Sequence, residues 1–325
     1  MNNFSHIYIE KDAIDYPVTK EILRRFKNSS IIYINHYKDV FNRSRQNFML
    51  QKRSQNLILA VKQSLFLYEG PDICQNFGHK NFYYASTILN CIYDCHYCYL
   101  QGLYPSANIV VFVNIDDFFM EVDKFLYKEP IYLCVSYDTD LMALEGIIPY
   151  ASKWIRFAKA RPKLLMEVRT KSANYKTIGD MEPLENVILA WTLSPKEIIE
   201  CYEARTPALD VRLKAAKMAM DQGWNVRISI EPIINIKGWR EIYRAFIEYI
   251  FAYLPSNAIY DINLGPFRMN REYFKTIYKF RADTDVFCLP MECKGDVVCC
   301  SNQNNMIQYM YEIISKYYPQ DKIYI

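Results

Sequence analysis

The sequence predicts an α/β fold built from parallel strands joined by helices. Short runs rich in Val, Ile and Leu alternate with stretches of helical periodicity, which is the pattern of repeated βα units. Hydrophobic residues make up 51% of the 325 residues, with only 9 Gly and 14 Pro, so a disordered or fibrous chain is excluded. The length admits one large domain or two ordinary ones, and the alternation favours one α/β unit with appended ends.

The predicted elements follow one another as strand and helix. Strands are expected at residues 83–88, 109–113, 131–135, 164–168, 187–192 and 226–231. Helices are expected at 116–127, 141–159 and 209–222, with a short turn at 181–185 and Gly223 as the stop of the last helix. Ligands of parallel sheets bind beyond the carboxyl ends of the strands, so polar residues at those ends are candidates for a site.

Charge and cysteine content restrict the class of protein. The net charge is only +3, which by itself does not announce a DNA-binding protein. No run of 18 uncharged apolar residues is present, and the first ten residues lack the basic-then-apolar order of a secretory signal. Ten cysteines in such a chain favour free thiols and metal ligands over disulfides, so a cytoplasmic location is expected.

Three cysteines on one short loop are the most informative motif. Cys91, Cys95 and Cys98 have C-x3-C-x2-C spacing, which suits thiolates that bind three irons of a four-iron cluster and leave the fourth iron open for a ligand. A structural zinc site would need a fourth ligand, for which His96 and Cys74 are candidates. A third interpretation is that the three cysteines are buried as small apolar side chains.

Several stretches resemble the radical S-adenosylmethionine (radical SAM) enzymes and, within them, the spore photoproduct lyase family. Next to the cysteine loop are F-Y-Y-A-S-T-I-L-N at 82–90 and C-H-Y-C-Y-L-Q at 95–101. Further similar stretches are Y-I-E-K-D-A-I-D-Y-P at 8–17, Y-E-A-R-T-P-A-L-D-V-R-L-K-A-A-K at 202–217, E-P-I-I-N-I-K-G-W at 231–239 and Y-P-Q-D-K-I-Y at 318–324. The resemblance therefore covers most of the chain.

The resemblance implies a fold, a reaction and its cofactors. It implies a partial (β/α)6 barrel over 82–256, an N-terminal α/β lobe over 1–81 and a C-terminal extension over 257–325 that covers the barrel. The implied reaction is reversal of the spore photoproduct thymine dimer in double-stranded DNA to two thymines through a 5′-deoxyadenosyl radical. The implied cofactors are a 4Fe-4S cluster and S-adenosyl-L-methionine, with electrons from a donor such as a flavodoxin or ferredoxin.

The same resemblance assigns the S-adenosylmethionine contacts. Ser136 and Lys171 take this role, and Thr192 stands where the family has a serine. The spacing from Lys171 to Thr192 matches the family. The alternative for Lys171 is an ordinary solvated loop lysine.

Hydrogen transfer is assigned to Cys134 by resemblance to the family's C-x-S motif. There, a thiol at the end of the third strand returns a hydrogen atom to the product radical. Tyr97 and Tyr99 flank the last cluster ligand, as do the family's tyrosines that are linked to a radical relay. The alternatives are a buried cysteine that serves only in packing, and phenols that are plain hydrogen-bond donors.

Two segments of the chain bear on the substrate. Basic and aromatic residues alternate between residues 11 and 62, a pattern that suits a nucleic-acid backbone as well as an ordinary solvated face. The family has a late hairpin with an aromatic, basic strand, whereas this chain has E-C-K-G-D-V-V-C-C at 292–300. Its Gly295-Asp296 pair predicts a turn, next to which Lys294 is a candidate phosphate contact.

Two alternatives therefore stay open at this stage. One is a related radical SAM enzyme that acts on a non-DNA substrate, and the other is a zinc-binding interaction module. Cys293, Cys299 and Cys300 are also candidates for an additional metal site, although neighbouring cysteines on a strand point to opposite faces.

Overall fold

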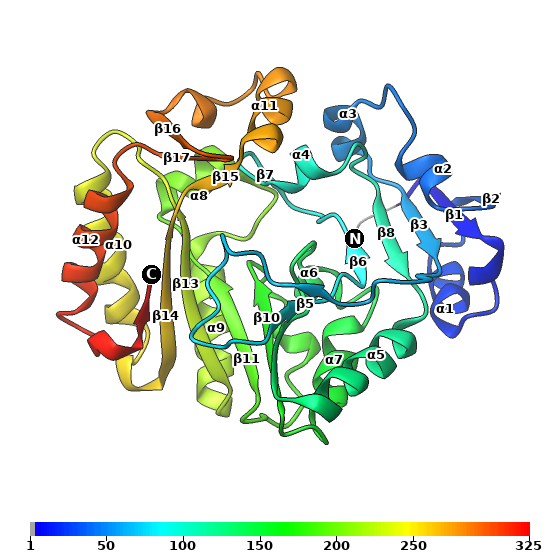
Figure 1. The fold of residues 1–325 in the computed structure, drawn as a ribbon, viewed down its shortest axis with the longest axis horizontal. Coiled ribbons are helices and arrows are strands. Elements are labelled where there is room, and N and C mark those ends of the chain that lie inside the picture. Colours follow the sequence, from blue (N-terminus) through cyan, green and yellow to red (C-terminus); the bar gives the residue numbers. More distant parts are fainter. Residues whose placement is uncertain (1–3) are drawn as a thin grey trace.

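The structure is a computed structural model that describes residues 4–325. Two sheets of mainly parallel strands dominate it, as Figure 1 shows. Strands from residues 6–112, drawn in blue and cyan, build one sheet, and the larger sheet is built mainly from later strands in green and yellow, joined by the early strands β4 and β5 and by the C-terminal strand β18. Two small antiparallel sheets complete the described part of the chain.

The N-terminal sheet has five strands in the order β2-β1-β3-β8-β6. Neighbours from β2 to β8 pair in parallel, and β6 closes one edge in the antiparallel sense. Their bounds are β1 (His6–Glu10), β2 (Ser30–Ile34), β3 (Leu57–Ala60), β6 (Ile88–Leu89) and β8 (Ile109–Phe112). Every residue of β3 and β8 is buried, which is why both strands consist of aliphatic or aromatic residues without alternation.

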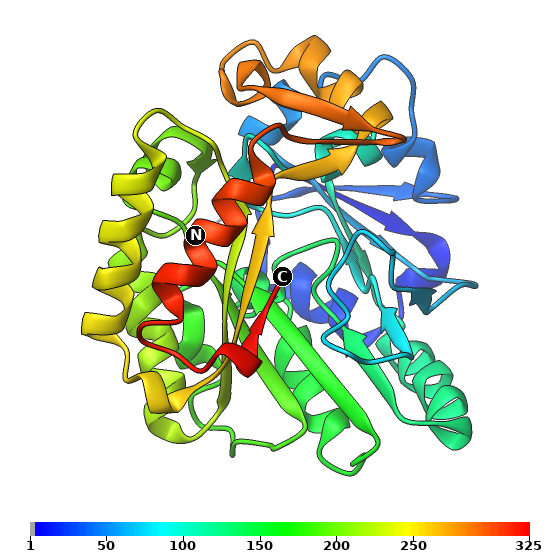
Figure 2. The same ribbon diagram turned by 60° about the vertical axis from the view of Figure 1, so that its left-hand side comes forward.

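The large sheet has eight strands in the order β18-β14-β13-β11-β10-β9-β5-β4. All neighbours are parallel except β4 and β5. Their bounds are β4 (Tyr68–Glu69), β5 (Phe82–Tyr84), β9 (Ile131–Cys134), β10 (Leu164–Thr170), β11 (Val187–Thr192), β13 (Asn225–Ile233), β14 (Ile259–Pro266) and β18 (Ile323–Tyr324). Figure 2 shows this sheet curling around, with β14 and the C-terminus on its near side.

Helices connect the strands and cover the outside of the large sheet (Figure 1). Their bounds are α1 (Pro17–Arg25), α2 (Lys38–Phe41), α3 (Phe48–Arg53), α4 (Leu100–Leu103), α5 (Ile115–Lys128), α6 (Leu141–Leu144), α7 (Tyr150–Ala158), α8 (Lys196–Tyr202), α9 (Leu209–Gln222), α10 (Trp239–Tyr253), α11 (Arg271–Phe280) and α12 (Gln303–Ile314). No helix within residues 4–325 is long and apolar enough to cross a membrane.

Two of the predicted helices lie where they were expected. Helix α5 covers the predicted 116–127 with one residue more at each end, and α9 has the predicted bounds. Gly223 ends α9 with φ 101°, a left-handed conformation that glycine adopts without strain.

The predicted helix at 141–159 is two helices, α6 and α7. Pro149 precedes α7 and cannot continue a helix that arrives from α6, because its nitrogen carries no proton. The Glu145 carboxylate accepts hydrogen bonds from the amides of Ala151 (2.7 Å) and Ser152 (3.0 Å), which otherwise have no partner in the first turn of α7.

Two strand assignments need correction. The strand predicted at 109–113 is β8, but it pairs with β3 in the N-terminal sheet and not with the large sheet. The sixth strand of the parallel series is β14, which lies in the segment predicted as a C-terminal extension. The predicted strand 83–88 is also divided between β5 and β6, so the chain passes from one sheet to the other just before the cysteine loop.

The late hairpin is present, with its turn where it was predicted. It consists of β16 (Met291–Lys294) and β17 (Val297–Cys300), with β15 (Arg268–Asn270) on the other side of β17. Gly295 has φ 59°, as a tight turn requires.

The structure supports neither a free Lys294 at this turn nor an additional metal site in the hairpin. The Lys294 ammonium lies 2.9 Å from the carboxylate of Glu292, so this lysine is paired within the hairpin. Cys299 directs its thiol to Glu292 and Cys300 directs its thiol to Met306, while Cys293 is exposed. The three thiols therefore point in different directions, and an additional metal site here is not supported.

Candidate active site

The cysteine loop runs between the two sheets. Cys91 follows β6 of the N-terminal sheet, Cys95 lies on the short strand β7 (Asp94–Cys95), and Cys98 precedes α4. Strand β7 pairs in the antiparallel sense with β12 (Glu203–Ala204), so that Cys95 lies opposite Glu203. A segment more than a hundred residues later therefore fixes the middle of the loop.

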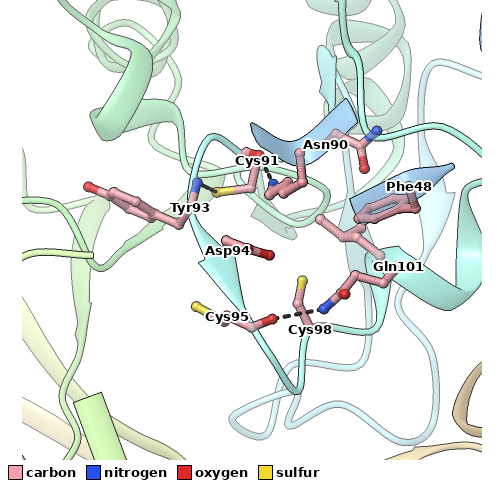
Figure 3. A pocket seen from close by; sticks show the side chains of 10 residues that line it. Phe48, Asn90, Cys91, Tyr93, Asp94, Cys95, Cys98 and Gln101 are labelled. Atoms are coloured by element: carbon pink, nitrogen blue, oxygen red, sulfur yellow. Dashed lines mark hydrogen bonds between the residues drawn. The ribbon is translucent and has the colours of Figure 1, made fainter. Parts of the chain in front are cut away.

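All three thiols line one pocket, shown in Figure 3. The Tyr93 amide donates to the Cys91 sulfur at 3.4 Å, and the Cys98 amide donates to the Cys95 carbonyl at 3.1 Å. The remaining lining residues are Phe48, Lys52, Asn90, Tyr93, Asp94, Leu100 and Gln101. The loop is thus closed by its own backbone with its sulfur atoms on the pocket side.

Gln101 and Arg281 fix the backbone of the cysteine loop through hydrogen bonds. The side-chain amide of Gln101 donates to the carbonyl groups of Cys95 (2.8 Å) and His96 (3.1 Å). Its oxygen accepts from Nε of Arg281 at 2.8 Å, and the Arg281 guanidinium also pairs with Asp94. These contacts satisfy backbone carbonyl groups that the tight loop cannot pair internally.

The candidate fourth zinc ligands do not line this pocket. The Cys74 thiol lies 3.4 Å from the Tyr137 hydroxyl, away from the loop, and His96 is absent from the pocket lining. Within the described range 4–325, no three side chains of the metal-binding types converge on a single ion position. The donor set is three sulfur atoms of one loop, which fits a cluster whose irons each take one thiolate.

Burial and the charge of Lys52 act in opposite directions on the ionisation of the thiols. Burial raises the pKa of Cys91 to about 12 and also raises the pKa values of Cys95 and Cys98. Lys52 is only 5% exposed, and its ammonium donates to the Cys91 carbonyl. Burial lowers the pKa of Lys52, while the nearby thiols act in the opposite direction. A cationic side chain enclosed with three sulfur atoms favours deprotonated, metal-bound thiolates.

Lys52 also corrects the predicted basic surface. It belongs to the basic, aromatic segment 11–62, but it lines the cysteine pocket, and the aromatic residues Phe41 and Phe48 of that segment are buried as well. Exposed cations such as Arg24 remain on this lobe, where Arg24 pairs with Glu21. The interleaved pattern is therefore partly internal structure.

Lys171 and Tyr97 meet at a buried carboxylate. Lys171 follows β10, and its ammonium donates to the Tyr97 hydroxyl at 3.2 Å and lies 3.6 Å from the carboxylate of Glu203. The Tyr97 hydroxyl donates to the same carboxylate, which also pairs with Arg212. Lys171 is therefore fixed toward the cysteine loop, which excludes the solvated-lysine interpretation.

Tyr99 is anchored by a second buried carboxylate. Its hydroxyl donates to the Tyr137 carbonyl (2.9 Å) and to Asp138 (3.1 Å). Ser86 donates to the same Asp138 side chain. Burial raises the pKa of Asp138, although the Ser86, Tyr104 and Tyr99 hydroxyl groups act against this.

Cys134, Ser136 and Thr192 lie at the carboxyl ends of neighbouring strands. Cys134 ends β9, which is the second strand of the parallel series rather than the third, and it is buried. Burial raises the pKa of its thiol to about 12, so the thiol keeps its proton at neutral pH. The Ser136 hydroxyl accepts from the Arg169 amide at 2.6 Å, and buried Thr192 ends β11.

A family model described as "SPL: Spore photoproduct lyase" matches residues 3–280 of the chain. The chain belongs to the spore photoproduct lyase family. The spore photoproduct lyase of Bacillus subtilis is 23% identical over 264 residues, covering 79% of this chain and 75% of the relative. The spore photoproduct lyase of Clostridium acetobutylicum is 22% identical over 260 residues, which cover 76% of this chain and 74% of the relative.

Solved structures of spore photoproduct lyases share the fold. A double mutant with bound AdoMet and dinucleoside spore photoproduct gives a TM-score of 0.84 at 20% identity, covering 99% of this chain and 97% of that one. A spore photoproduct lyase complexed with dinucleoside spore photoproduct gives a TM-score of 0.83 with the same coverage of both chains. The similarity in fold therefore extends beyond the region that the family model matches.

The sequence analysis did not find the residues that hold the predicted site residues in place. Glu203 stood in a stretch that resembles the family but received no role, and Asp138 and Lys52 were not considered as parts of the site. Their partners lie 106, 39 and 39 residues away along the chain. Only the position of Asp138, just beyond a strand end, was a usable signal.

Proposed function

We propose that the protein is a radical SAM DNA repair enzyme that reverses the spore photoproduct thymine dimer to two thymines. Membership of the spore photoproduct lyase family carries this proposal, together with the pocket that brings the thiols of Cys91, Cys95 and Cys98 together. Two similar structures hold dinucleoside spore photoproduct, and one of them also holds AdoMet.

The six parallel strands β5-β9-β10-β11-β13-β14 form the partial (β/α)6 barrel of this proposal. Their order in the sheet and their parallel sense support it. The candidate site residues follow the ends of β9, β10 and β11, as expected for a ligand bound at the carboxyl edge of a parallel sheet.

The cysteine loop would hold a 4Fe-4S cluster, and S-adenosyl-L-methionine would bind next to it. Together these groups supply a 5′-deoxyadenosyl radical when bound, because the cofactors carry the difficult chemistry. Lys171 is oriented toward the loop by Tyr97 and Glu203 and would contact the carboxylate of S-adenosylmethionine. Ser136 and Thr192 would complete the contacts from two other strand ends.

Cys134 would return a hydrogen atom to the product radical. Its thiol keeps the proton because burial raises its pKa, and a weak S–H bond transfers hydrogen readily to carbon. Tyr99, anchored on Asp138, and Tyr97, anchored on Glu203, would act after this step as radical carriers.

The partners in this proposal are lesion-bearing double-stranded DNA and a small electron donor such as a flavodoxin or ferredoxin. The paired Lys294 and the absence of aromatic residues from residues 291–300 favour a modest contribution of the hairpin to DNA binding. A cytoplasmic location belongs to the same proposal, because free thiols and an iron–sulfur cluster require a reducing compartment.

A product assay tests the proposal. Anaerobically reconstituted protein, with S-adenosylmethionine and dithionite, should convert the synthetic dinucleotide spore photoproduct to intact thymine dinucleotide. A cyclobutane thymine dimer should not react, because its two bonds between the bases require a different fragmentation. Cleavage of S-adenosylmethionine without any thymine product would instead support a radical SAM enzyme acting on another substrate.

A further inference from the structure

We infer that Arg169, Glu231 and Arg268 form a subsite that binds the hydrogen-bonding edge of one thymine ring of the lesion. This inference deepens the proposed function and rests on it. The three side chains would distinguish the imide of an intact thymine ring from other rings, and the sequence assigned none of them a role in binding or catalysis.

The three side chains form a row in which a carboxylate lies between two guanidinium groups. Arg169 donates from Nη1 to Oε2 of Glu231 at 2.9 Å, and Arg268 donates from Nη2 to Oε1 at 3.3 Å. Asn263, on the further strand β14, donates to Oε2 at 3.0 Å and so fixes the carboxylate. The residues come from β10, β13 and β15, so the tertiary fold alone assembles the row.

Gly265 on the neighbouring strand β14 is required for this arrangement. A Cβ atom at position 265 would lie 2.5 Å from Oε1 of Glu231. The carboxylate therefore occupies the space that any larger residue at 265 would fill. The close approach ties the position of Glu231 to the absence of a side chain.

The row is accessible, whereas the charges beneath it are sealed. The side chains of Arg169, Glu231 and Arg268 are 28%, 26% and 25% exposed. One layer further into the sheet, Glu167 and Arg227 are each 1% exposed and pair with one another. A molecule that enters from the carboxyl edge of the sheet therefore meets the row and can go no further.

The row lies beside the thiol that would donate the hydrogen atom. Cys134 is opposite Glu167 in the register of β9 and β10, and Arg169 is two residues further along the same face of β10. The positive charge of Arg169 acts on the thiol of Cys134, and all three members of the row act on Cys74. A base held by the row would therefore be close to Cys134.

The donors and acceptors of the row complement a thymine ring. The edge of the ring presents a carbonyl acceptor, the imide N3–H donor and a second carbonyl acceptor. Two guanidinium groups on either side of a carboxylate present donor, acceptor and donor. Among residues 4–325, Nη2 of Arg169 and Nε and Nη1 of Arg268 have no acceptor, and Oε1 of Glu231 accepts only one of the two bonds that it can accommodate.

Competition between the lesion and an N3-methylated lesion tests the subsite. Equilibrium binding of each dinucleotide should be measured on the cluster-loaded protein with S-adenosylmethionine present. We expect the wild-type protein to bind the unmodified lesion at least tenfold more tightly, because the methyl group removes the N3–H donor that Glu231 accepts. Glu231→Gln should lower affinity for the unmodified lesion while leaving affinity for the N3-methylated lesion within about twofold. Arg268→Met should lower affinity for both lesions, because both keep the carbonyl group to which Arg268 donates.

Matched controls exclude a general effect on folding. Arg244→Met removes an exposed arginine of α10 that donates to the Tyr309 hydroxyl of α12, away from the row, and it should leave both affinities unchanged. Iron content and thermal midpoint of the variants should equal those of the wild type. The subsite inference is overturned if the wild-type protein binds both lesions equally while still repairing the unmodified one. Absence of any lesion binding would overturn the proposed substrate and the subsite together.

Discussion

Glu167→Gln removes one charge from the sealed layer beneath the proposed base-binding row. Burial raises the pKa of the Glu167 carboxyl group, but Arg169 and Arg227 outweigh this effect and hold the pKa at about 2 instead of the ordinary 4.5. Such a difference corresponds to about 3 kcal/mol of folding free energy at pH 7. Arg227 keeps Asp261 as its second carboxylate partner, so no uncompensated buried charge is left to add to this loss.

Urea unfolding of the cluster-loaded protein under anaerobic conditions measures this loss. Glu200→Gln is the matched control, since its carboxylate is exposed and pairs with Lys196 at 3.7 Å, and it should change the unfolding free energy by less than about 0.5 kcal/mol. The folded pKa of Glu167 lies below the unfolded one, so its stabilisation is complete above pH 4.5 and declines as pH falls towards 2. The difference in unfolding free energy between the wild type and Glu167→Gln should therefore become smaller as pH falls from 4.5 towards 2. A loss below about 1 kcal/mol at pH 7 would refute the reasoning.

Three further predictions concern the reaction and the DNA. Cys95→Ala should abolish cluster binding, so the iron content of anaerobically reconstituted protein should fall from its wild-type value of close to four irons per chain. A wild-type protein that contains one zinc and no labile sulfide would contradict the assignment. Cys134→Ala should still open the lesion but divert the product radical to adducts with solutes, detected by mass spectrometry, and intact thymines at the wild-type rate and yield would show that the donor lies elsewhere. Affinity for duplex DNA should fall with salt, and a plot of log affinity against log salt concentration should have a slope of about −0.9 per neutralised phosphate. Lys294→Ala should reduce the preference for damaged DNA more than Arg24→Ala does, although the pairing of Lys294 with Glu292 keeps the effect small. Equal binding of damaged and undamaged oligonucleotides by both variants and the wild type would exclude a role for the hairpin.

The cysteine loop could be predicted from sequence because its chemistry is local. Three ligands within eight residues report their spacing directly, and the turn at Gly295 and the end of α9 at Gly223 are equally local signals. These predictions needed no knowledge of which strands pair.

Strand partners were harder to predict, for a physical reason. The buried run of β8 is equally suitable for the interior of either sheet, so the sequence 109–112 could not reveal that it pairs with β3. Strand β14 was missed because its inward positions are polar: Asp261 pairs with Arg227, and Asn263 binds Glu231. Hydrophobic periodicity does not detect a strand whose inner face lines a polar site.

The return of β8 to the N-terminal sheet has a consequence for synthesis of the chain. When β1, β2 and β3 leave the ribosome, β3 still lacks its second neighbour, which arrives about fifty residues later with residues 109–112. The buried edge of β3 must remain unpaired during that interval, and the cysteine loop is made within it. We therefore expect the nascent chain to need protection from aggregation while residues 61–108 are added, and the loop to become fixed only after Glu203 has been synthesised to pair with Cys95.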